Sequence, residues 1–234
     1  NKQMTETQET VTKVNKQTTM TNRDYYKVML VAPSGKGKTM SFRNMNSNTT
    51  GFINIEDKPL PFKNTFKYHG RPKSVSETKS LLKEYASNPE ITTIVVDSFS
   101  AYVEMLLSEA RLTKKGFDIW NQYNEEIGKF LNYIKSIQKE IFITAHYEIL
   151  GIEGNQEKRI KVKGKEWEGL IEKEFTVVLY ADSKFNDKGI SEYFFNTVQE
   201  GTSAKCPPDL LGKDVCKVTN DCNKIYEAIV EFTK

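Results

Sequence analysis

The sequence predicts an α/β fold in which a mostly parallel central β-sheet is flanked by helices. Two observations carry this prediction. Short runs of almost uninterrupted apolar residues recur along the chain, and segments with helical periodicity separate them. Near-continuous apolar runs are typical of parallel strands that are buried on both faces. Their alternation with helices is typical of a doubly wound sheet.

The expected strands are the apolar runs 28–32, 52–55, 91–96, 141–145, 176–180 and 193–198. The clearest helix spans 121–139, where apolar residues recur at steps of three and four and form one core-facing stripe. A second helix is expected to begin at a capping box made by Ser74 and Glu77 and to end before Pro89. A C-terminal β extension completes the expected sheet, and a last helical pattern in 207–234 is expected to pack back on the core.

Composition and charge exclude several classes of protein. The 38% apolar content, with 13 Phe and 11 Tyr in 234 residues, excludes wholesale disorder. With 34 Lys and Arg against 31 Asp and Glu, the net charge is +3, which excludes a wholly basic nucleic-acid coat but permits a local basic site. No apolar run approaches the roughly 20 residues of a membrane span. The three cysteines form no CxxC pair and are expected to be free thiols, so we expect a cytoplasmic protein without a membrane partner.

The chain is expected to divide into a tail and one domain. Residues 1–22 are rich in Thr, Gln, Asn and Lys and contain almost no large apolar groups. Such a segment cannot bury enough surface to offset its ordering entropy, so we expect a mobile tail. Residues 23–234 are expected to form a single domain, because a chain of this size buries roughly 70–75% of its surface on folding without a disulfide or metal.

The first apolar run leads directly into a phosphate-binding motif. Ala32-Pro33-Ser34-Gly35-Lys36-Gly37-Lys38-Thr39 matches the P-loop pattern GxxxxGK[ST], with alanine in the first glycine position. The glycines let the backbone curl so that successive N–H groups point at phosphate oxygens, and a helix beginning near Lys38 is expected to add its positive end. The Lys38 ammonium is expected to lie between the β- and γ-phosphates. The residues expected to hold ATP are Ser34, Gly35, Lys36, Gly37, Lys38, Thr39 and Met40.

Two acids at the ends of expected strands suit phosphoryl transfer, which needs a carboxylate for Mg²⁺ and a group that orients the attacking water. Asp97 ends the third apolar run in the Walker B manner, and it is expected to bind Mg²⁺ together with the Thr39 hydroxyl. Ser98 is either a hydrogen-bond partner in the site or the N-cap of the next helix. Glu56 ends the second apolar run. Ligands of open parallel sheets sit beyond the carboxyl ends of strands, so Glu56 is in the right layer to polarise a water, and a solvated loop acid is the alternative.

These motifs in this order resemble the RecA-like ATPase core. That family has a P-loop, a glutamate at the end of the next strand, a Walker B aspartate followed by serine, and a polar sensor residue at the end of the following strand. The resemblance implies a RecA-like P-loop NTPase fold and ATPase activity, with Lys38 and Glu56 as catalytic residues. The sensor position falls on His146, where the family usually has glutamine, and histidine can also donate to phosphate.

Residues 25–212 resemble more closely the small phage-encoded RecA-like proteins that promote single-strand annealing and recombination. The pieces that carry this resemblance are Asp97-Ser98, Trp120, Thr144-Ala145-His146, Phe195-Asn196-Thr197 and Ala204-Lys205. The resemblance implies a DNA-dependent ATPase that acts on single-stranded DNA, in the host cytoplasm if the protein is phage-encoded. It also implies a homo-oligomer, a ring or a filament, with the ATP site at the subunit interface. A single-strand DNA-binding protein is a further expected partner.

In RecA-like proteins the DNA-contacting loops follow the Walker B region and the sensor strand. This sequence has a basic segment at each of these two positions. The cations in these segments are Lys114 and Lys115 in the first, and Arg159, Lys161, Lys163 and Lys165 in the second. If 159–165 is a strand, its four cations share one face at roughly 6–7 Å spacing and can follow a phosphate backbone. Trp167 would then be placed to stack on a base. The alternative is a solvated hairpin whose charges protect a sheet edge.

The resemblance further implies a cation from a neighbouring subunit that stabilises the charge of the transition state. Lys205 is the candidate, and an exposed surface lysine is the alternative. Besides the DNA-dependent ATPase, two functions stay open. One is a P-loop kinase of a small metabolite or nucleotide, which usually needs several arginines over the phosphates. The other is an ATP-gated DNA-binding or loader module with little turnover. No motif in the sequence distinguishes adenine from guanine.

Overall fold

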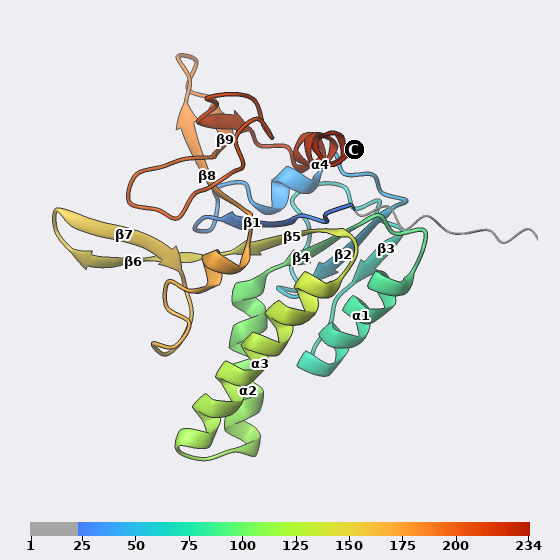
Figure 1. The fold of residues 1–234 in the computed structure, drawn as a ribbon, viewed down its shortest axis with the longest axis vertical. Coiled ribbons are helices and arrows are strands. Elements are labelled where there is room, and N and C mark those ends of the chain that lie inside the picture. The colour runs from blue at the N-terminus through green and yellow to red at the C-terminus, as the bar shows by residue number, and fades with distance from the viewer. Residues whose placement is uncertain (1–22) are drawn as a thin grey trace, which may run out of the picture.

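The computed structural model describes residues 23–234, and the expected tail at 1–22 lies outside the described residues (Figure 1). The main sheet runs in the order β10-β9-β8-β1-β5-β4-β2-β3. Its strands are β1 Lys27–Val31, β2 Thr50–Asn54, β3 Tyr68–Gly70, β4 Thr93–Asp97, β5 Glu140–Ala145, β8 Val177–Phe185, β9 Ser191–Asn196 and β10 Lys217–Thr219. A separate antiparallel hairpin is formed by β6 (Tyr147–Ile152) and β7 (Asn155–Ile160), and it projects beyond the sheet.

The strand directions confirm the predicted α/β fold class. The six neighbouring strands β8, β1, β5, β4, β2 and β3 pair in parallel. The pairs β8–β9 and β9–β10 are antiparallel and form the C-terminal β extension. Each of the six apolar runs predicted as a strand overlaps an observed strand, although the bounds shift by up to five residues.

Helices cover both faces of the sheet. The helices are α1 Val75–Ser87, α2 Phe99–Thr113, α3 Phe117–Ser136 and α4 Cys222–Phe232, with 3₁₀ turns η1 Thr39–Phe42 and η2 Ile171–Glu174. The first three lie on one face of the sheet and α4 lies on the other (Figure 1). In β1, Met29 and Val31 belong to the core under α1–α3, whereas Val28 and Leu30 belong to the core under α4. Burial on both faces explains why the apolar run of this strand is continuous.

The helix signals act as the sequence predicts. The Ser74 hydroxyl accepts a hydrogen bond from the Glu77 backbone N–H at 3.1 Å and so caps α1. The predicted stripe of α3 is buried in the core. In α4, Ile225 and Ile229 are buried, as the helical pattern predicts, while Phe232 at its end is half exposed.

The prediction of an α-helix that begins near Lys38 is wrong. Only the single 3₁₀ turn η1 follows the P-loop, and its hydrogen bonds include Ser41 N to Gly37 O at 3.0 Å and to Lys38 O at 3.2 Å. The following residues, 44–50, are mostly Asn, Ser and Thr, which compete with the helical backbone through their own side chains. The strand β2 already begins at Thr50, so the chain has no room for a longer helix.

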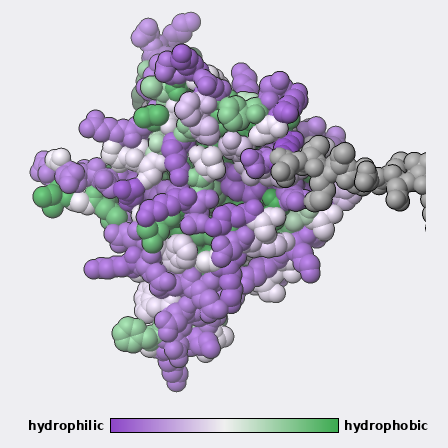
Figure 2. All heavy atoms as spheres, in the orientation of Figure 1, coloured by the Kyte–Doolittle hydropathy of each residue, from purple (hydrophilic) through white to green (hydrophobic). Residues whose placement is uncertain are grey.

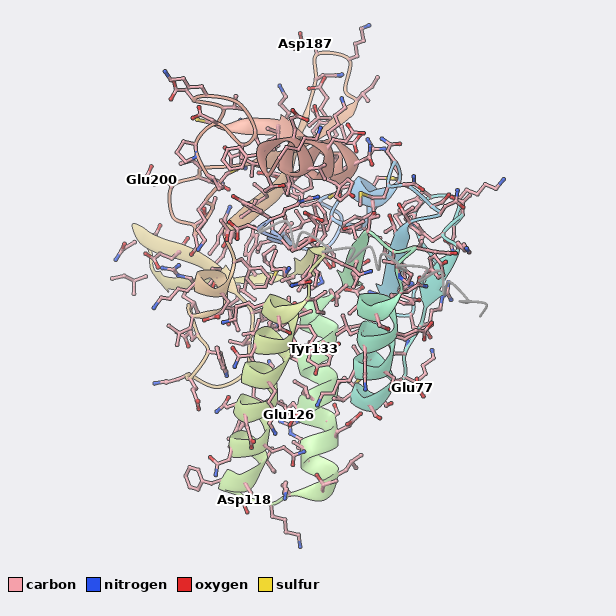
Figure 3. The ribbon with its side chains drawn as sticks, turned by 45° about the vertical axis from the view of Figure 1, so that its right-hand side comes forward. Glu77, Asp118, Glu126, Tyr133, Asp187 and Glu200 are labelled. Carbon is pink, nitrogen blue, oxygen red and sulfur yellow. The ribbon has the colours of Figure 1, made fainter. Side chains whose placement is uncertain are left out.

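The surface seen in Figure 2 is mostly hydrophilic, with isolated apolar side chains. Large exposed apolar side chains include Leu112 and Phe117 at the α2–α3 turn and Ile152 in the β6–β7 hairpin. The α2–α3 turn, marked by Asp118, and the β8–β9 turn, marked by Asp187, lie at opposite ends of the molecule (Figure 3). Within 23–234, none of the helices has the length and apolar character needed to cross a lipid bilayer.

Candidate nucleotide site

The predicted phosphate, metal and water residues meet at the carboxyl edge of the sheet. The neighbouring strands β1, β5, β4 and β2 end side by side at this edge. The chain that follows each strand carries one functional group of the site. A cavity of about 360 Å³ opens there, and the residues that line it are Ser34, Gly35, Gly37, Lys38, Thr39, Met40, Asn54, Glu56, Lys58, Pro59, Leu60, Pro61, Asp97, His146 and Tyr193.

The P-loop has the backbone geometry that its glycines permit. Gly35 and Gly37 adopt φ values of +80° and +83°, in the left-handed region that favours glycine. The Lys38 ammonium is folded onto the loop and donates to the carbonyl oxygens of Ala32 at 2.7 Å and Pro33 at 2.9 Å. Burial lowers the pKa of Lys38 to about 8, against the opposing effect of the carboxylates of the site. Because a triphosphate is negatively charged, its binding would favour the protonated form of Lys38.

The side chains expected to bind magnesium are already joined. The Thr39 hydroxyl donates to Asp97 Oδ2 at 2.8 Å, and the Thr144 hydroxyl donates to Asp97 Oδ1. Burial raises the pKa of Asp97, and these two hydrogen bonds oppose that rise. One carboxylate and one hydroxyl suit Mg²⁺, which takes its other ligands from phosphates and water. Within 23–234, no cluster of three or more His, Cys, Asp or Glu side chains is placed to hold a metal ion.

Glu56 is held by three partners in the cavity. His146 Nε2 lies 3.5 Å from Glu56 Oε1, Lys58 Nζ lies 2.8 Å from Oε2, and the Ser98 hydroxyl donates to Oε1 at 3.0 Å. The His146 imidazole, followed by Lys58 and Ser98, holds the pKa of Glu56 well below its ordinary value, although partial burial acts in the other direction. An ionised carboxylate beyond the end of β2 can orient and polarise a water beside the γ-phosphate.

Ser98 performs both of the roles left open by the sequence. Its hydroxyl donates to Glu56 and also accepts from the Ala101 backbone N–H at 3.2 Å, so it caps α2. The first turn of α2 is thereby tied to Glu56. The Ser98 hydroxyl therefore connects the position of Glu56 to the N-terminus of this helix.

Comparison with known protein families places the chain in one of them. A family model described as an AAA domain matches residues 24–214. The chain belongs to the AAA domain family. A solved structure with similarity to the chain is that of a KaiC-like protein from the hyperthermophilic archaeon Pyrococcus horikoshii OT3. It is 12% identical, with a TM-score of 0.43, and the match covers 73% of this chain and 78% of the other. No curated protein matches the chain.

Membership in the AAA domain family supports a P-loop ATPase, for which a bound nucleotide and Mg²⁺ are expected. The matched range contains the P-loop, both acids and His146, so all of these residues lie inside the AAA domain. When bound, Mg²⁺ would supply positive charge to the phosphate oxygens, with Thr39 and Asp97 holding it. Lys38 would orient the triphosphate, and Glu56 would hold the attacking water.

Two predicted site residues of the AAA domain point elsewhere. The Lys36 ammonium lies 2.9 Å from Asp182 Oδ1 and 3.1 Å from Ser183 Oγ, so its side chain points to β8 and not into the cavity. Lys205 extends the sheet through backbone hydrogen bonds to Val178 in both directions, at 2.8 and 2.9 Å. Its side chain does not line the cavity of its own chain.

Residues 159–165 do not form the strand that would place their four cations on one face. The strand β7 ends at Ile160, and Lys161 N then donates to His146 O at 2.9 Å while Lys163 N donates to the Tyr123 hydroxyl at 3.1 Å. Gly164, at φ +76°, turns the chain so that the alternation does not continue to Lys165. The exposed lysines are still present, but they do not form one straight row.

The basic residue Arg159 and the aromatic residue Trp167 also differ from expectation. Arg159 pairs with Glu157 at 2.6 Å and bonds the Ser203 hydroxyl, so its charge is already partnered. The expectation that Trp167 stacks on a base is wrong, because its ring packs against the core and its Nε1 donates to Asn124 O at 3.1 Å. Lys114 and Lys115 lie where the sequence places them, exposed at the α2–α3 turn.

Sequence reasoning missed one wall of the cavity. Lys58, Pro59, Leu60 and Pro61 follow Glu56 directly, and adjacency to a predicted site residue was a signal that could have found them. Tyr193, on β9, had no such signal because it reaches the P-loop only through the pairing of the C-terminal strands.

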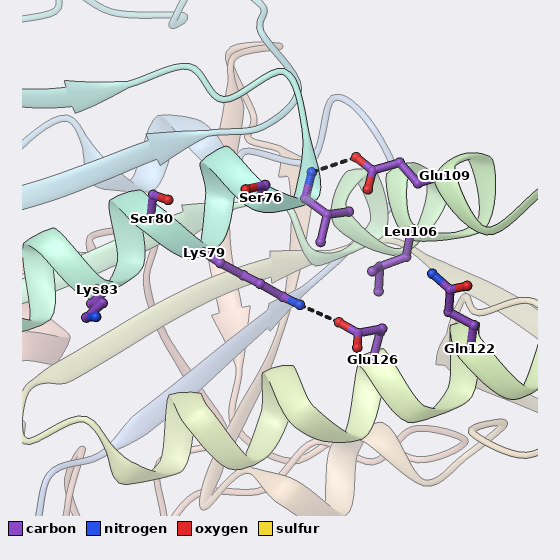
Figure 4. Close-up of a pocket in the computed structure, with 9 residues that line it drawn as sticks. Ser76, Lys79, Ser80, Lys83, Leu106, Glu109, Gln122 and Glu126 are labelled. Atoms are coloured by element: carbon purple, nitrogen blue, oxygen red, sulfur yellow. Dashed lines mark hydrogen bonds and ion pairs between the residues drawn. The ribbon is translucent and has the colours of Figure 1, made fainter. Parts of the chain in front are cut away.

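A second cavity, of about 490 Å³, lies between α1 and the α2–α3 pair (Figure 4). The Lys79 ammonium pairs with Glu126 there, and Val75 N donates to Glu109 Oε1 at 2.8 Å. None of the residues predicted to bind nucleotide, metal or DNA lines this cavity. Its ion pair joins α1 to α3. Because most of the residues predicted to bind nucleotide and metal line the smaller cavity at the sheet edge instead, we assign the nucleotide chemistry of the AAA domain to that cavity.

Proposed function

We propose that this AAA-domain ATPase is a RecA-type protein whose ATP turnover is stimulated by single-stranded DNA, and that it promotes strand annealing or strand exchange in phage recombination. The observation that carries the proposal is the position of His146. This residue lies in the wall of the nucleotide cavity and also lines a small cavity with Lys161 and Lys163. One side chain therefore separates the expected γ-phosphate from a basic surface.

The backbone of His146 connects the same two places. Its N–H donates to Ser100 Oγ in the first turn of α2 at 2.9 Å, and its carbonyl accepts from Lys161 N at 2.9 Å. The ring contacts Glu56. If the γ-phosphate draws the imidazole away from Glu56, the start of α2 and the backbone at Lys161 move with it.

The two basic segments border the same part of α3. Gly164 lies against the Trp120 ring, so the segment containing Lys161 and Lys163 packs beside the first turns of α3. Lys114 and Lys115 immediately precede this helix. Exposed lysines that share one region can neutralise several phosphates of one strand, and the release of counterions then makes binding depend on salt.

The proposal includes a homo-oligomer, a ring or a filament, with the ATP site at the subunit interface. Because Lys205 does not line the cavity of its own chain, a catalytic role for it requires a neighbouring subunit. ATP would close neighbouring subunits and order the basic segments on DNA, and hydrolysis directed by Glu56 would release it. We further propose that the protein acts in the host cytoplasm beside a single-strand DNA-binding protein.

The test is steady-state ATP hydrolysis with and without single-stranded DNA. The wild type is expected to be stimulated by DNA, and Glu56→Gln is expected to bind ATP and DNA with little turnover. Replacing Lys161, Lys163 and Lys165 together by Gln is expected to abolish the stimulation and to flatten its salt dependence. Three exposed lysines outside the two basic segments, Lys188, Lys213 and Lys224, provide a control of equal charge change.

The alternatives give different results in the same assay. Turnover that requires a small acceptor and ignores DNA would indicate a kinase. Binding of ATP and DNA without turnover would indicate a gated loader. Equal stimulation of the wild type and of the Lys161, Lys163 and Lys165 variant would contradict the proposed DNA surface.

A further inference from the structure

The carboxamide of Asn220 lies buried beside the P-loop without a partner. The residue is 2% exposed, and neither its Oδ1 nor its Nδ2 has a hydrogen-bond partner among the residues that the structure describes. Buried polar groups in native proteins are almost always hydrogen-bonded to protein, water or ligand. A donor and an acceptor left open on one rigid side chain therefore indicate a ligand with the complementary pair.

Asn220 and Tyr193 form one unit next to the nucleotide cavity. The pairing of Thr219 with Phe194 places Asn220 opposite Tyr193 across β10 and β9. A β-carbon at Gly37 would lie 2.9 Å from Tyr193 Cδ1 and 3.2 Å from Asn220 Nδ2, so both side chains lie against the P-loop. The Tyr193 ring lines the cavity, whereas the carboxamide is buried next to it against Gly37 and does not line the cavity.

The chain around Asn220 is fixed to the segment that follows the P-loop. Three hydrogen bonds join the two segments: Ser41 Oγ to Cys222 Sγ at 3.0 Å, Arg43 Nη1 to Asn220 O at 2.9 Å, and Asn44 Nδ2 to Asp221 Oδ2 at 2.7 Å. The carboxamide therefore keeps a constant position relative to the phosphates. Such fixed positioning is what recognition of a ligand edge requires.

The position of the phosphates determines where the base must lie. Asp97, Glu56 and His146, the groups expected around the γ-phosphate, line the cavity on the β2, β4 and β5 side of the P-loop. A triphosphate that follows the loop then directs its base to the other side, where β9 and β10 carry Tyr193 and Asn220.

We propose that Tyr193 and Asn220 form the base-recognition subsite and that they select adenine. The Tyr193 ring is 40% exposed and its hydroxyl has no hydrogen bond within 23–234, so it is free to turn outward and stack on the base. The uncovered carboxamide then accepts from adenine N6 through Oδ1 and donates to N7 through Nδ2, the bidentate pairing in which asparagine matches adenine. Guanine presents two acceptors on this edge, O6 and N7, and leaves Oδ1 without a donor. The assignment rests on the ATPase activity of the site and does not require DNA.

The test measures the binding of Mg²⁺ complexes of ATP, GTP and 7-deaza-ATP by calorimetry, in the absence of DNA. The wild type is expected to prefer ATP to GTP by about 10- to 100-fold and to bind 7-deaza-ATP about 10-fold more weakly than ATP. In Asn220→Leu, which keeps the size of the side chain, the three affinities are expected to become equal. Its melting temperature without nucleotide is expected not to fall, because no hydrogen bond is lost. Tyr193→Leu is expected to weaken all three nucleotides, and Tyr193→Phe to weaken none.

Asn223→Leu is the matched control. This asparagine lies three residues along the chain and bonds Glu227, so its loss is expected to leave the preference for ATP intact. Equal binding of ATP and 7-deaza-ATP by the wild type would overturn the proposal even if Asn220→Leu did not fold. A wild-type preference between ATP and GTP that survives in Asn220→Leu would overturn it as well. A wild type that binds no nucleotide would overturn the ATPase assignment together with this subsite, whereas an intact base preference without stimulation by DNA would contradict the DNA proposal alone.

Discussion

The burial of Lys38 predicts that ATP binding takes up a proton in mildly alkaline solution. In the free protein the ammonium lies on the carbonyls of Ala32 and Pro33, and burial lowers its pKa to about 8. A triphosphate beside the ammonium favours the charged form and raises this pKa. The affinity for Mg²⁺–ATP is therefore expected to be constant well below pH 8 and to fall as the pH rises above that value.

The magnitude follows from the pKa. At pH 9, a group with a pKa of about 8 is roughly nine-tenths deprotonated, so ATP must bind together with about 0.9 protons and about tenfold more weakly than at pH 7. Each further pH unit costs at most another factor of ten, until the pKa of the complex is reached. The proton uptake is measured by calorimetry at pH 9 in two buffers with different heats of ionisation.

The control is Lys38→Arg, which carries a guanidinium that stays protonated over this range. Whatever its affinity, this variant is expected to bind ATP without proton uptake at pH 9. Zero uptake by the wild type, or equal uptake by both proteins, would show that Lys38 does not titrate near pH 8.

Three further predictions concern the metal ligand, the subunit interface and the core. Replacing Thr144 by Val should leave one oxygen of buried Asp97 without its donor and lower the free energy of unfolding by about 1–3 kcal/mol, and urea unfolding with a change below 0.5 kcal/mol would contradict this. If Lys205 completes the site of a neighbouring subunit, Lys205→Ala and Lys38→Ala should each be inactive and a mixture should recover ATPase activity; no recovery would contradict a shared site. Replacing fully buried Leu82 by Ala should cost about 2–5 kcal/mol in thermal or urea unfolding without changing nucleotide affinity, and an unchanged stability would contradict its place in the core.

Much of the fold could be predicted because its central strands are buried on both faces. In such strands most residues are apolar on both faces, so the runs are visible without an alignment. The strands that the sequence did not reveal are short or exposed: β3 has three residues, β10 has three, and all residues of the β6–β7 hairpin strands except Ile160 are at least partly exposed. Their positions depend on pairing with partners that are distant along the chain, which local periodicity does not report.

The site divides in the same way. Groups that end an apolar strand, such as Glu56 and Asp97, could be placed because chain direction fixes the edge at which they lie. Asn220 could not be placed, because it reaches Gly37 only after β10 has paired with β9. The prediction of one row of cations over 159–165 failed because the chain bends there. Gly164 turns it, and hydrogen bonds from the backbone N–H groups of Lys161 and Lys163 fix it, none of which the charge pattern reports.

The proposed function requires that the bound nucleotide change the affinity for single-stranded DNA through His146. It is tested most directly by the anisotropy of a labelled oligonucleotide with Glu56→Gln, with and without Mg²⁺–ATP. We predict that ATP tightens DNA binding by about 5- to 150-fold in this variant, and that adding His146→Ala removes the effect while both ligands still bind. Equal DNA affinity with and without ATP, in a protein shown to hold the nucleotide, would contradict it.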